Sequence, residues 1–496
     1  MWKLISLILP VIVLLPAYAF PQTTFEKTYG GSGEDGGNSV YQTTDGGYIV
    51  AGWTESYGAG LFDAYLIKTD PSGEILWTRT FGGASPDSGS SVIQTQDGGY
   101  IITGSTKSFS QTGWPDVYLI KTDPAGDSLW TRYYGSFGID VGTSVQENPD
   151  GGYSIAGFTH SSGAGEADVY SIRTDSSGDT LWTRTYGGAW YDRAYSMQQT
   201  TDGGYILAGM TASFGAGSYD VYLIKTDSSG DTLWTRTYGN NGDNYGYSVQ
   251  QTPDGGYVLA GATPGPGIYD VYLIKTDAEG DSLWTRTYDF GGLDGAYSVR
   301  RTLDGGYVVA GLTGTYELGD SFDVLLFKTD SSGDILWTRT YGGPDYEEGL
   351  SVQQTSDGGY IIAGRTESFG AGDYDVYLIK TDPDGLVGIG GDEQDPITIP
   401  RSLLLSQNYP NPFNPSTTIS FEIPDLTSER QDVSLTIYDL RGRLIRRLVD
   451  SRLEPGRHRL VWDGKDGGGE RVPSGVYLYT LRANGGASTR KMMVLK

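Results

Sequence analysis

The 496-residue chain has no cysteine and only two histidines, His160 and His458. The absence of cysteine excludes disulfides, thiol nucleophiles and cysteine-ligated metals, so stability must come from the core and the topology. Two histidines are too few for a multi-histidine metal centre. The sequence also lacks the G-x-S-x-G, H-E-x-x-H and P-loop motifs of common hydrolases, proteases and nucleotide-binding enzymes. We therefore predict a protein that is not an enzyme.

Long hydrophobic runs are absent except at the N-terminus. Lys3 precedes an apolar stretch from Leu4 to Leu15, and the small residues of Ala17–Ala19 follow it. This order is typical of a secretory signal peptide, and the stretch is shorter than the ~20 residues that span a bilayer. We predict a signal peptide over residues 1–19, a secreted mature chain and no transmembrane segment in it.

Basic residues are scarce in the body of the chain. Residues 1–400 contain 20 Lys+Arg and 51 Asp+Glu, whereas residues 401–496 contain 15 and 10. Nucleic-acid binders need a positive track, so the body is predicted to bind no nucleic acid. A solvated acidic surface explains this charge most simply, and bound Ca²⁺ or a basic partner is the more specific alternative.

A repeat of 50 to 53 residues fills most of the chain. The string DGGY begins at Asp45, Asp97, Asp150, Asp202, Asp254, Asp304 and Asp357. Each copy offers four short runs rich in Val, Ile, Tyr, Thr and Trp, like YSVQQT, GYIIAG, DVYLIKTD and LWTRTYGG, separated by Gly-rich and Asp-rich turns. Four antiparallel strands repeated seven times predict a seven-bladed β-propeller over residues 23–382, with a β-solenoid as the main rival.

The two ends of the repeat array favour a closed ring. The fourth run carries its tryptophan six times only, at Trp77, Trp130, Trp182, Trp234, Trp284 and Trp337. The N-terminal segment Thr23–Gly31 matches the missing run, with Phe25 in place of the tryptophan. We predict that it pairs beside Asp375–Asp382 and completes the last blade.

These residues resemble the quinoprotein-like propeller repeat over about residues 23–385. The resemblance implies that SVQQT-like strands lie innermost, that LWTRT-like strands form the rim, and that each tryptophan docks between blades. A fold shared by many proteins implies no particular ligand or activity.

A second domain follows a Gly-rich, Pro-rich and acidic linker over residues 383–402. Six or seven short runs over residues 403–496 predict an Ig-like β-sandwich. The strings NYPNPFNPSTTISFEIP, IYDLRGRLIRRL and KMMVLK resemble the C-terminal sorting domain of type IX secretion, and equally the Ig-like domain of flagellar hook-cap proteins. The first resemblance implies outer-membrane secretion machinery as a partner and an extracellular or outer-surface location on a Gram-negative-type bacterium. Its signal residues are Asn408, Pro410, Asn411, Pro412, Phe413, Asn414, Pro415, Lys491 and Lys496.

Acidic residues recur at fixed places in each repeat. A catalytic group is needed once, so Asp before and after the third run and in DGG are predicted to form turns by accepting backbone N–H bonds. A further set lies at the edge of the inner strand, where carboxylates could bind Ca²⁺ at the channel mouth or form turns. No other cofactor is expected. The set is Asp35, Asp87, Asp140, Asp192 and Asp294, with Asn244 and Glu347 in the remaining repeats.

Aromatic residues that differ between repeats are the better indication of a ligand site. We expect them in the longer loops on one face, where rings suit sugars or a partner's apolar patch, although packing between loops also explains them. The predicted ligand-binding residues are Trp114, Trp190, Tyr191, Tyr195, Tyr245, Tyr247 and Tyr297. Three functions remain open: an exported module that binds glycan or surface protein, an exported lyase or glycosidase on the same face, and a purely structural surface module.

Overall fold

The computed structural model describes residues 23–266, 268–315, 321–387, 404–405, 408, 413, 416–423, 430–453, 456–483 and 486–495. The predicted signal peptide and most of the predicted linker lie outside these residues. Every regular element of the described residues is a β-strand. Within the described part of the chain, no helix has the length and apolar character to cross a bilayer.

Residues 25–381 form five four-stranded sheets and one eight-stranded sheet that contains two more such units, here called blades 1 to 7. Blade 1 comprises β2 (Asp35–Gln42), β3 (Tyr48–Thr54), β4 (Asp63–Thr69) and β5 (Ile75–Phe81). Blade 2 comprises β6 (Asp87–Gln94), β7 (Tyr100–Thr106), β8 (Asp116–Thr122) and β9 (Ser128–Tyr134). Blade 3 comprises β10 (Asp140–Glu147), β11 (Tyr153–Thr159), β12 (Asp168–Thr174) and β13 (Thr180–Tyr186). Blade 4 comprises β14 (Asp192–Gln199), β15 (Tyr205–Thr211), β16 (Asp220–Thr226) and β17 (Thr232–Tyr238).

The other three blades follow the same order. Blade 5 comprises β18 (Tyr245–Gln251), β19 (Tyr257–Pro264), β20 (Tyr269–Thr276) and β21 (Ser282–Tyr288). Blade 6 comprises β22 (Leu293–Arg301), β23 (Tyr307–Thr315), β24 (Ser321–Thr329) and β25 (Ile335–Tyr341). Blade 7 comprises β26 (Glu347–Gln354), β27 (Tyr360–Thr366), β28 (Asp375–Thr381) and the N-terminal strand β1 (Phe25–Tyr29).

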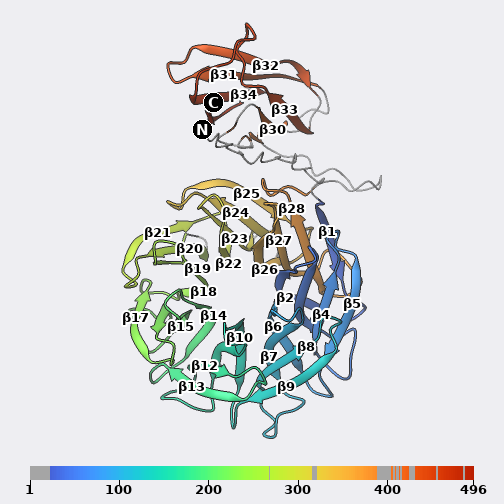
Figure 1. Ribbon diagram of the computed structural model, residues 1–496, viewed down its shortest axis with the longest axis vertical. Helices are drawn as coiled ribbons and strands as arrows, with labels where there is room; N and C mark the ends of the chain where they lie inside the picture. Colours follow the sequence, from blue (N-terminus) through green and yellow to red (C-terminus); the bar gives the residue numbers. More distant parts are fainter. Residues whose placement is uncertain are drawn as a thin grey trace, which may run out of the picture.

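The blades lie around a ring, with the first strand of each blade innermost and the fourth on the rim (Figure 1). β1 pairs antiparallel with β28, with Phe25 opposite Lys380 and Tyr29 opposite Val376. The two ends of the repeat array therefore belong to one sheet. The prediction of an all-β chain with repeated four-stranded sheets, closed by the N-terminal strand, is confirmed.

The hydrophobic core lies between neighbouring blades. One cluster joins Ile49 and Leu66 of blade 1 to Tyr100 and Ile120 of blade 2, and equivalent clusters recur around the ring. Both faces of each sheet are thus buried, which explains the nearly continuous apolar runs of the second and third strands. Each blade needs a neighbour on both sides, so a closed ring leaves no apolar face uncovered.

The tryptophans of the rim strands dock onto the next blade, as the resemblance implied. Trp77 of β5 packs edge-on against Tyr100, with ring centroids 5.8 Å apart. It also lies on Gly126, where a Cβ would stand 2.6 Å from the indole. Gly126 has φ +82°, so both the turn and the indole require glycine at this position.

The inner strands are linked by hydrogen bonds that run round the ring. A serine hydroxyl in each blade accepts the backbone N–H of a residue in the next blade, at 3.2–3.4 Å. The pairs are Ser39–Val92, Ser91–Val145, Ser144–Met197, Ser196–Val249, Ser248–Val299, Ser298–Val352 and Ser351–Val40. The last pair links blade 7 to blade 1, which is a second closure besides β1.

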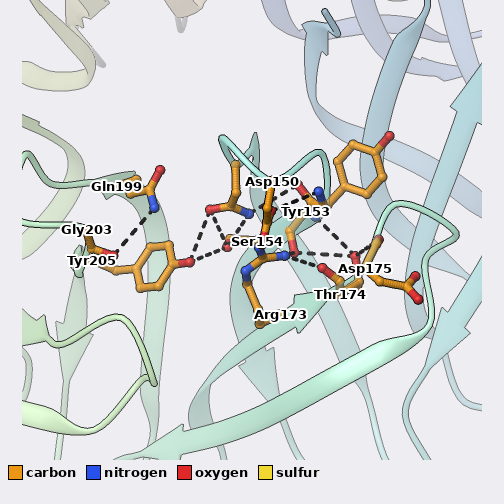
Figure 2. Close-up of polar contacts among 11 residues, drawn as sticks. Asp150, Tyr153, Ser154, Arg173, Thr174, Asp175, Gln199, Gly203 and Tyr205 are labelled. Atoms are coloured by element: carbon orange, nitrogen blue, oxygen red, sulfur yellow. Dashed lines mark hydrogen bonds and ion pairs between the residues drawn. The ribbon is translucent and has the colours of Figure 1, made fainter. Parts of the chain in front are cut away.

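The repeated aspartates of the hairpins form turns, as predicted. Asp70 Oδ1 accepts the N–H groups of Ser72 and Glu74 at 2.8 and 2.9 Å. The Asp of DGG forms its turn in the same way, since Asp45 Oδ1 accepts Gly47 N at 3.0 Å, and it also pairs with a buried cation of the third strand, such as Lys68 with Asp45 at 2.9 Å. In blade 3 this cation is Arg173, which pairs with Asp150 (Figure 2).

Blade 3 also shares a buried polar network with blade 4. The Tyr205 hydroxyl of blade 4 donates to Asn148 Oδ1 at 3.1 Å and accepts from Ser154 Oγ at 2.9 Å (Figure 2). All three side chains are buried. These bonds fix the stagger between the two blades, because each buried polar atom needs its partner in the neighbouring sheet.

The C-terminal domain has two sheets. One contains β29 (Leu404–Leu405), β30 (Thr417–Ile423) and β33 (Gly456–Trp462). The other has the order β32 (Leu444–Leu453), β31 (Gln431–Asp439), β34 (Gly475–Ala483) and β35 (Gly486–Val494). Their inner faces meet in an apolar core around the fully buried Trp462 and Tyr479.

Two of the predicted sorting residues are part of this core. Asn408 N donates to the Tyr479 hydroxyl at 2.8 Å. Phe413 packs on Trp462 and exchanges backbone bonds with the last strand, donating to Met493 O and accepting from Leu495 N. Lys491 is exposed on β35. The predicted sorting residues Pro410, Asn411, Pro412, Asn414, Pro415 and Lys496 lie outside the described residues.

Candidate functional site

Each inner strand contains a β-bulge, and the residue at the bulge differs from blade to blade. The register shift falls at the same place in all seven blades. An unpaired bulge residue is free of the sheet's alternation, so its side chain can be redirected. The bulge residues are Asn38, Ser90, Thr143, Tyr195, Tyr247, Tyr297 and Leu350.

Three consecutive blades thus place a tyrosine at the same point of the inner ring. The Tyr195 and Tyr247 ring centroids are 5.2 Å apart, as are those of Tyr247 and Tyr297. Tyr245 stacks on Tyr247 at 5.7 Å with an interplanar angle of 12°. We call these four half-buried tyrosines the aromatic arc. In blades 1 and 3, by contrast, Asn38 and Thr143 at the bulge donate to backbone carbonyls of the next blade.

The sequence placed these rings in loops, and that assignment is wrong. Tyr195 belongs to β14, Tyr245 and Tyr247 to β18, and Tyr297 to β22. The inner strands begin before the apolar run that marks them in the sequence. The bulge breaks the period of two, so the first residues of each strand do not look like a strand.

A buried ion pair lies at one end of the arc. Arg365 Nε is 2.7 Å from Glu348 Oε1, and Glu348 is only 4% exposed. The Tyr346 hydroxyl donates to Glu348 Oε2 at 2.9 Å, and the Arg365 guanidinium lies 4.8 Å from the centre of the Tyr374 ring. Burial would lower the pKa of Arg365, but Glu348 raises it above its usual value. Arg365 and Glu348 thus form a fixed polar edge beside the rings.

A second arginine lies at the other end of the arc. The Arg193 guanidinium stands 4.5 Å from the Phe158 ring centre and 5.6 Å from that of Tyr191. Tyr191 also contacts His160, with centroids 6.0 Å apart. Cation–π contacts of this kind hold the arginine in place beside the arc. Polar side chains therefore flank the arc on both sides.

Burial raises the pKa of the arc's tyrosines. The pKa of Tyr247, Tyr245 and Tyr297 is raised first by desolvation and then by neighbouring tyrosine and acidic groups. Burial also raises the pKa of Tyr374 to about 12. All of these phenols are neutral at physiological pH, so they offer apolar ring faces and hydroxyl donors rather than negative charge.

The other predicted aromatic residues do not join the arc. Trp114 and Trp190 are 52% and 57% exposed, and the ring contacts of the arc include neither. Tyr191 belongs to the Arg193 group instead. The sequence prediction missed Glu348, Arg365 and Arg193. Arg365 is the one charge at its position among the seven blades, whereas Glu348 and Arg193 share one repeat position that is uncharged in the other five blades. A search for irregular charges as well as rings would have found them.

The predicted metal residues lie in the junctions between blades rather than at an open channel mouth. Asp35, Asp87, Asp140, Asp192 and Asp294 are all at most 1% exposed. Each accepts bonds from the connection that precedes its strand; Asp87 Oδ2, for example, accepts Gly83 N at 2.9 Å. Each also faces an aspartate on the third strand of the preceding blade. Sequence spacing could not show this pairing, because it depends on how adjacent blades stack.

An acidic depression lies where blade 7 meets blade 1. It has a volume of about 440 Å³ and is lined by Glu34, Asp345, Glu367, Gly372, Asp373 and Tyr374. Tyr374 also contacts Arg365. The polar end of the arc therefore borders this acidic hollow.

Comparison with known proteins identifies the C-terminal domain. Residues 410–487 match the FlgD Ig-like domain family. Basal-body rod modification protein FlgD of Salmonella typhimurium is 29% identical over 92 residues, which are 18% of this chain and 39% of that protein. The predicted Ig-like fold of this domain is confirmed.

Other comparisons cover more of the chain. Regulatory protein FlaEY of Caulobacter vibrioides is 27% identical over 229 residues, which are 41% of this chain and 24% of that protein. The chain thus spans about a quarter of FlaEY and two-fifths of FlgD. Among solved structures, PorZ, an essential bacterial surface component of the type-IX secretion system of Porphyromonas gingivalis, matches with TM-score 0.44 and 13% identity, covering 94% of this chain and 60% of PorZ. Puromycin hydrolase matches with TM-score 0.44 and 13% identity, covering 79% of this chain and 59% of its own.

Proposed function

We propose that this chain is a non-catalytic, exported binding protein that holds a carbohydrate at the aromatic arc. The observation that supports this is the run of tyrosines at three consecutive bulges, Tyr195, Tyr247 and Tyr297. The other bulges carry small, polar or aliphatic residues, so the fold itself does not require rings there. Half-buried tyrosine side chains on one side of the propeller give that side an aromatic surface that the other blades lack.

The chemistry of the arc suits a sugar. Ring faces pack on the apolar C–H face of a pyranose, and the flanking groups bond its hydroxyls. Glu348 and Arg365 offer an acceptor and donors in fixed positions, and Arg193 offers donors at the other end. The two charges of the buried ion pair neutralise each other, so the site favours hydroxyl-rich ligands over strongly charged ones.

The Ig-like domain is proposed to be the export signal. Its match to the FlgD Ig-like family concerns the fold, and the Pro-Asn-Pro-Phe-Asn-Pro string with the terminal basic strand is the feature that suggests sorting. Phe413 of that string forms a parallel bridge with Val494 of the terminal strand. The expected partner is outer-membrane secretion machinery, and the expected location is the cell exterior.

The binding test is a glycan array probed with the mature chain, followed by titration of any retained sugar. The decisive variant replaces Tyr195, Tyr247 and Tyr297 with serine, the residue that blade 2 carries at Ser90. Loss of the rings should weaken binding by about tenfold for each ring that stacks on the sugar.

The matched control is Ser90→Ala, which alters the same bulge on the other side of the ring and should leave affinity unchanged. Unfolding in urea verifies that each variant is folded. Equal affinity in the parent and the triple variant would contradict the proposed site. Release of reducing sugar from a bound glycan would contradict the non-catalytic assignment.

A further inference from the structure

The blade junctions contain paired carboxylates that meet around a glycine. At the junction of blades 1 and 2, a Cβ on Gly82 would stand 1.8 Å from Asp63 Oδ1 and 2.6 Å from Asp87 Oδ2. Glycine therefore leaves the room that the two carboxylates occupy. Six junctions have glycine at this place: Gly30, Gly82, Gly135, Gly187, Gly239 and Gly342.

The junction of blades 5 and 6 departs from this pattern at two positions. Asp289 replaces the glycine, in a connection of the same length. Pro266 stands four residues before Asp270, where blades 1, 3, 4 and 7 have alanine. Ala164 N and Ala216 N donate to the equivalent aspartates, each at 2.7 Å, but proline has no N–H to donate. Asp270 has thus lost a backbone donor and gained a third carboxylate.

The three carboxylates converge. Asp270, Asp289 and Asp294 each bring an oxygen within 4.8 Å of the other two. Asp270 and Asp294 are 4% and 0% exposed, and the Oδ1 atom of each is buried without a hydrogen-bond partner, as it is in Asp35, Asp63, Asp116, Asp140 and Asp192 of other junctions. What distinguishes this junction is the third carboxylate, Asp289. Among the described residues, no ion pair involves any of the three.

Uncompensated carboxylates at this spacing repel each other strongly in a buried setting. In five of the other junctions one shared proton can relieve a pair of acids, and at the junction of blades 4 and 5 Asn244 replaces one of the two acids. Here one proton would still leave two negative charges, one of them at the exposed rim of the cluster. A divalent cation compensates all three at once and gives the two orphaned oxygens a partner.

We propose that Asp270, Asp289 and Asp294 bind a calcium ion at the junction of blades 5 and 6. The donors are all carboxylate oxygens, which favours a hard cation over zinc or copper. Calcium accepts an irregular set of oxygen ligands at varied angles, whereas magnesium requires near-ideal octahedral geometry. The three residues come from β20, β22 and the connection between β21 and β22, so their arrangement is irregular.

The site has a structural consequence for the aromatic arc. Tyr269, next to Asp270, forms a parallel bridge with Leu293, next to Asp294, and this bridge joins blades 5 and 6. Tyr269 also contacts Tyr245 of the arc, with ring centroids 6.0 Å apart. Bound calcium would fix this bridge and the ring beside it. Calcium binding does not depend on the arc having a ligand, so the two proposals can fail separately.

The test is a titration of the EDTA-treated mature chain with CaCl₂, by calorimetry, in the parent and in Asp289→Gly. Glycine is the residue of the six other junctions, so this variant preserves the fold of the connection. We expect saturable binding in the parent and affinity weaker by at least about tenfold in the variant, since ligand charge sets calcium affinity. Asp345→Asn removes an exposed carboxylate from the equivalent connection of blade 7 and should bind like the parent.

Thermal unfolding provides a second test, because calcium should reverse the order of the melting temperatures of the parent and Asp289→Gly. In EDTA, Asp289→Gly should melt above the parent because it lacks the third repelling charge. In saturating Ca²⁺ the parent should melt above the variant. The proposed site would be overturned if the parent showed no saturable calcium binding, or if the parent and Asp289→Gly bound calcium with equal affinity. It would also be overturned if the order of the two melting temperatures were the same in EDTA and in saturating Ca²⁺. Asp289→Asn, which keeps the side-chain size, should reproduce the loss of affinity.

Discussion

The closing strand β1 should stabilise the whole ring, and Phe25→Ala tests this. Phe25 is 8% exposed and takes the place that tryptophan holds in the other blades. It packs edge-on against Tyr48 at 6.1 Å and lies on Gly73, where a Cβ would stand 2.7 Å from the phenyl ring. Its backbone belongs to blade 7, whereas its side chain contacts blade 1, so the residue joins the two ends of the chain.

The expected cost follows from this burial. Removing a buried phenyl ring costs about 3–5 kcal/mol when the surroundings cannot collapse into the cavity. Tyr29 contributes separately by donating to Gly73 O at 2.7 Å, a bond of about 0.5–1.5 kcal/mol. Chain termini usually tolerate substitution because they fray. A large cost at residue 25 is therefore specific to a closed ring.

The assay is urea unfolding of the mature chain, followed by tryptophan fluorescence. Trp234→Ala is the matched variant, because Trp234 occupies the equivalent rim position in a central blade and packs on Tyr257 at 5.9 Å. If β1 closes the ring, both variants should lose several kcal/mol of unfolding free energy. A cost near zero for Phe25→Ala beside a large cost for Trp234→Ala would refute the closure argument.

Two further predictions concern pH and export. Burial, and then the nearby Glu347, raises the pKa of Asp323 to about 6. Burial also raises the pKa of the equivalent junction aspartates, Asp63, Asp168 and Asp375. In the hairpin, by contrast, hydrogen bonds to Thr200 and Lys225 outweigh burial and lower the pKa of Asp202 to about 2. The folded state thus binds extra protons between about pH 4 and 6, so the free energy of unfolding should rise as pH falls from 7 to 5. Asp323 contributes at most about 1.4 kcal/mol to this rise, because only the pH unit below its pKa of about 6 lies in that interval. Below pH 4 the free energy of unfolding should fall again as the hairpin carboxylates protonate, and maximal stability at pH 7–8 in urea titrations would contradict this sign. Deletion of Met492–Lys496 removes Met492 and Val494 from the core of the Ig-like domain, so this domain should not fold. The propeller should still fold, but the protein should remain inside the outer membrane. Normal surface delivery of this truncation, measured by protease accessibility on intact cells, would exclude the sorting role.

Much of the scaffold could be predicted because its information is local and repeated. The Asp-x-x-Gly turns need an acceptor and a positive φ, and both are visible as residues at fixed spacing. The match of Thr23–Gly31 to a missing strand predicted the closure without any structure. These features depend on hydrogen bonds within a hairpin or on identity between copies, which a sequence displays directly.

The candidate site could be predicted only in part, because it depends on contacts across blades. Tyr195, Tyr247 and Tyr297 are about fifty residues apart and meet only when the sheets stack with one register. Their bulge also hides them, because it interrupts the alternation by which strands are recognised. The pairing of Glu348 with Arg365 crosses from β26 to β27 at the end of the strands, where the sequence gives no periodic signal.

The repeats themselves separate structural residues from functional candidates. A residue present in every blade must satisfy a need that every blade has, such as the turn at Asp70 or the serine bond between inner strands. A residue present once, where the other copies agree, satisfies no such need. Asp289 is a departure of this kind, and it adds a third carboxylate to a blade junction. The tyrosines of the arc stand at a position that varies between blades, in place of residues such as Asn38 and Thr143 that bond to the next blade. These irregular positions are the reason that we propose to seek cation and ligand binding in blades 4 to 7.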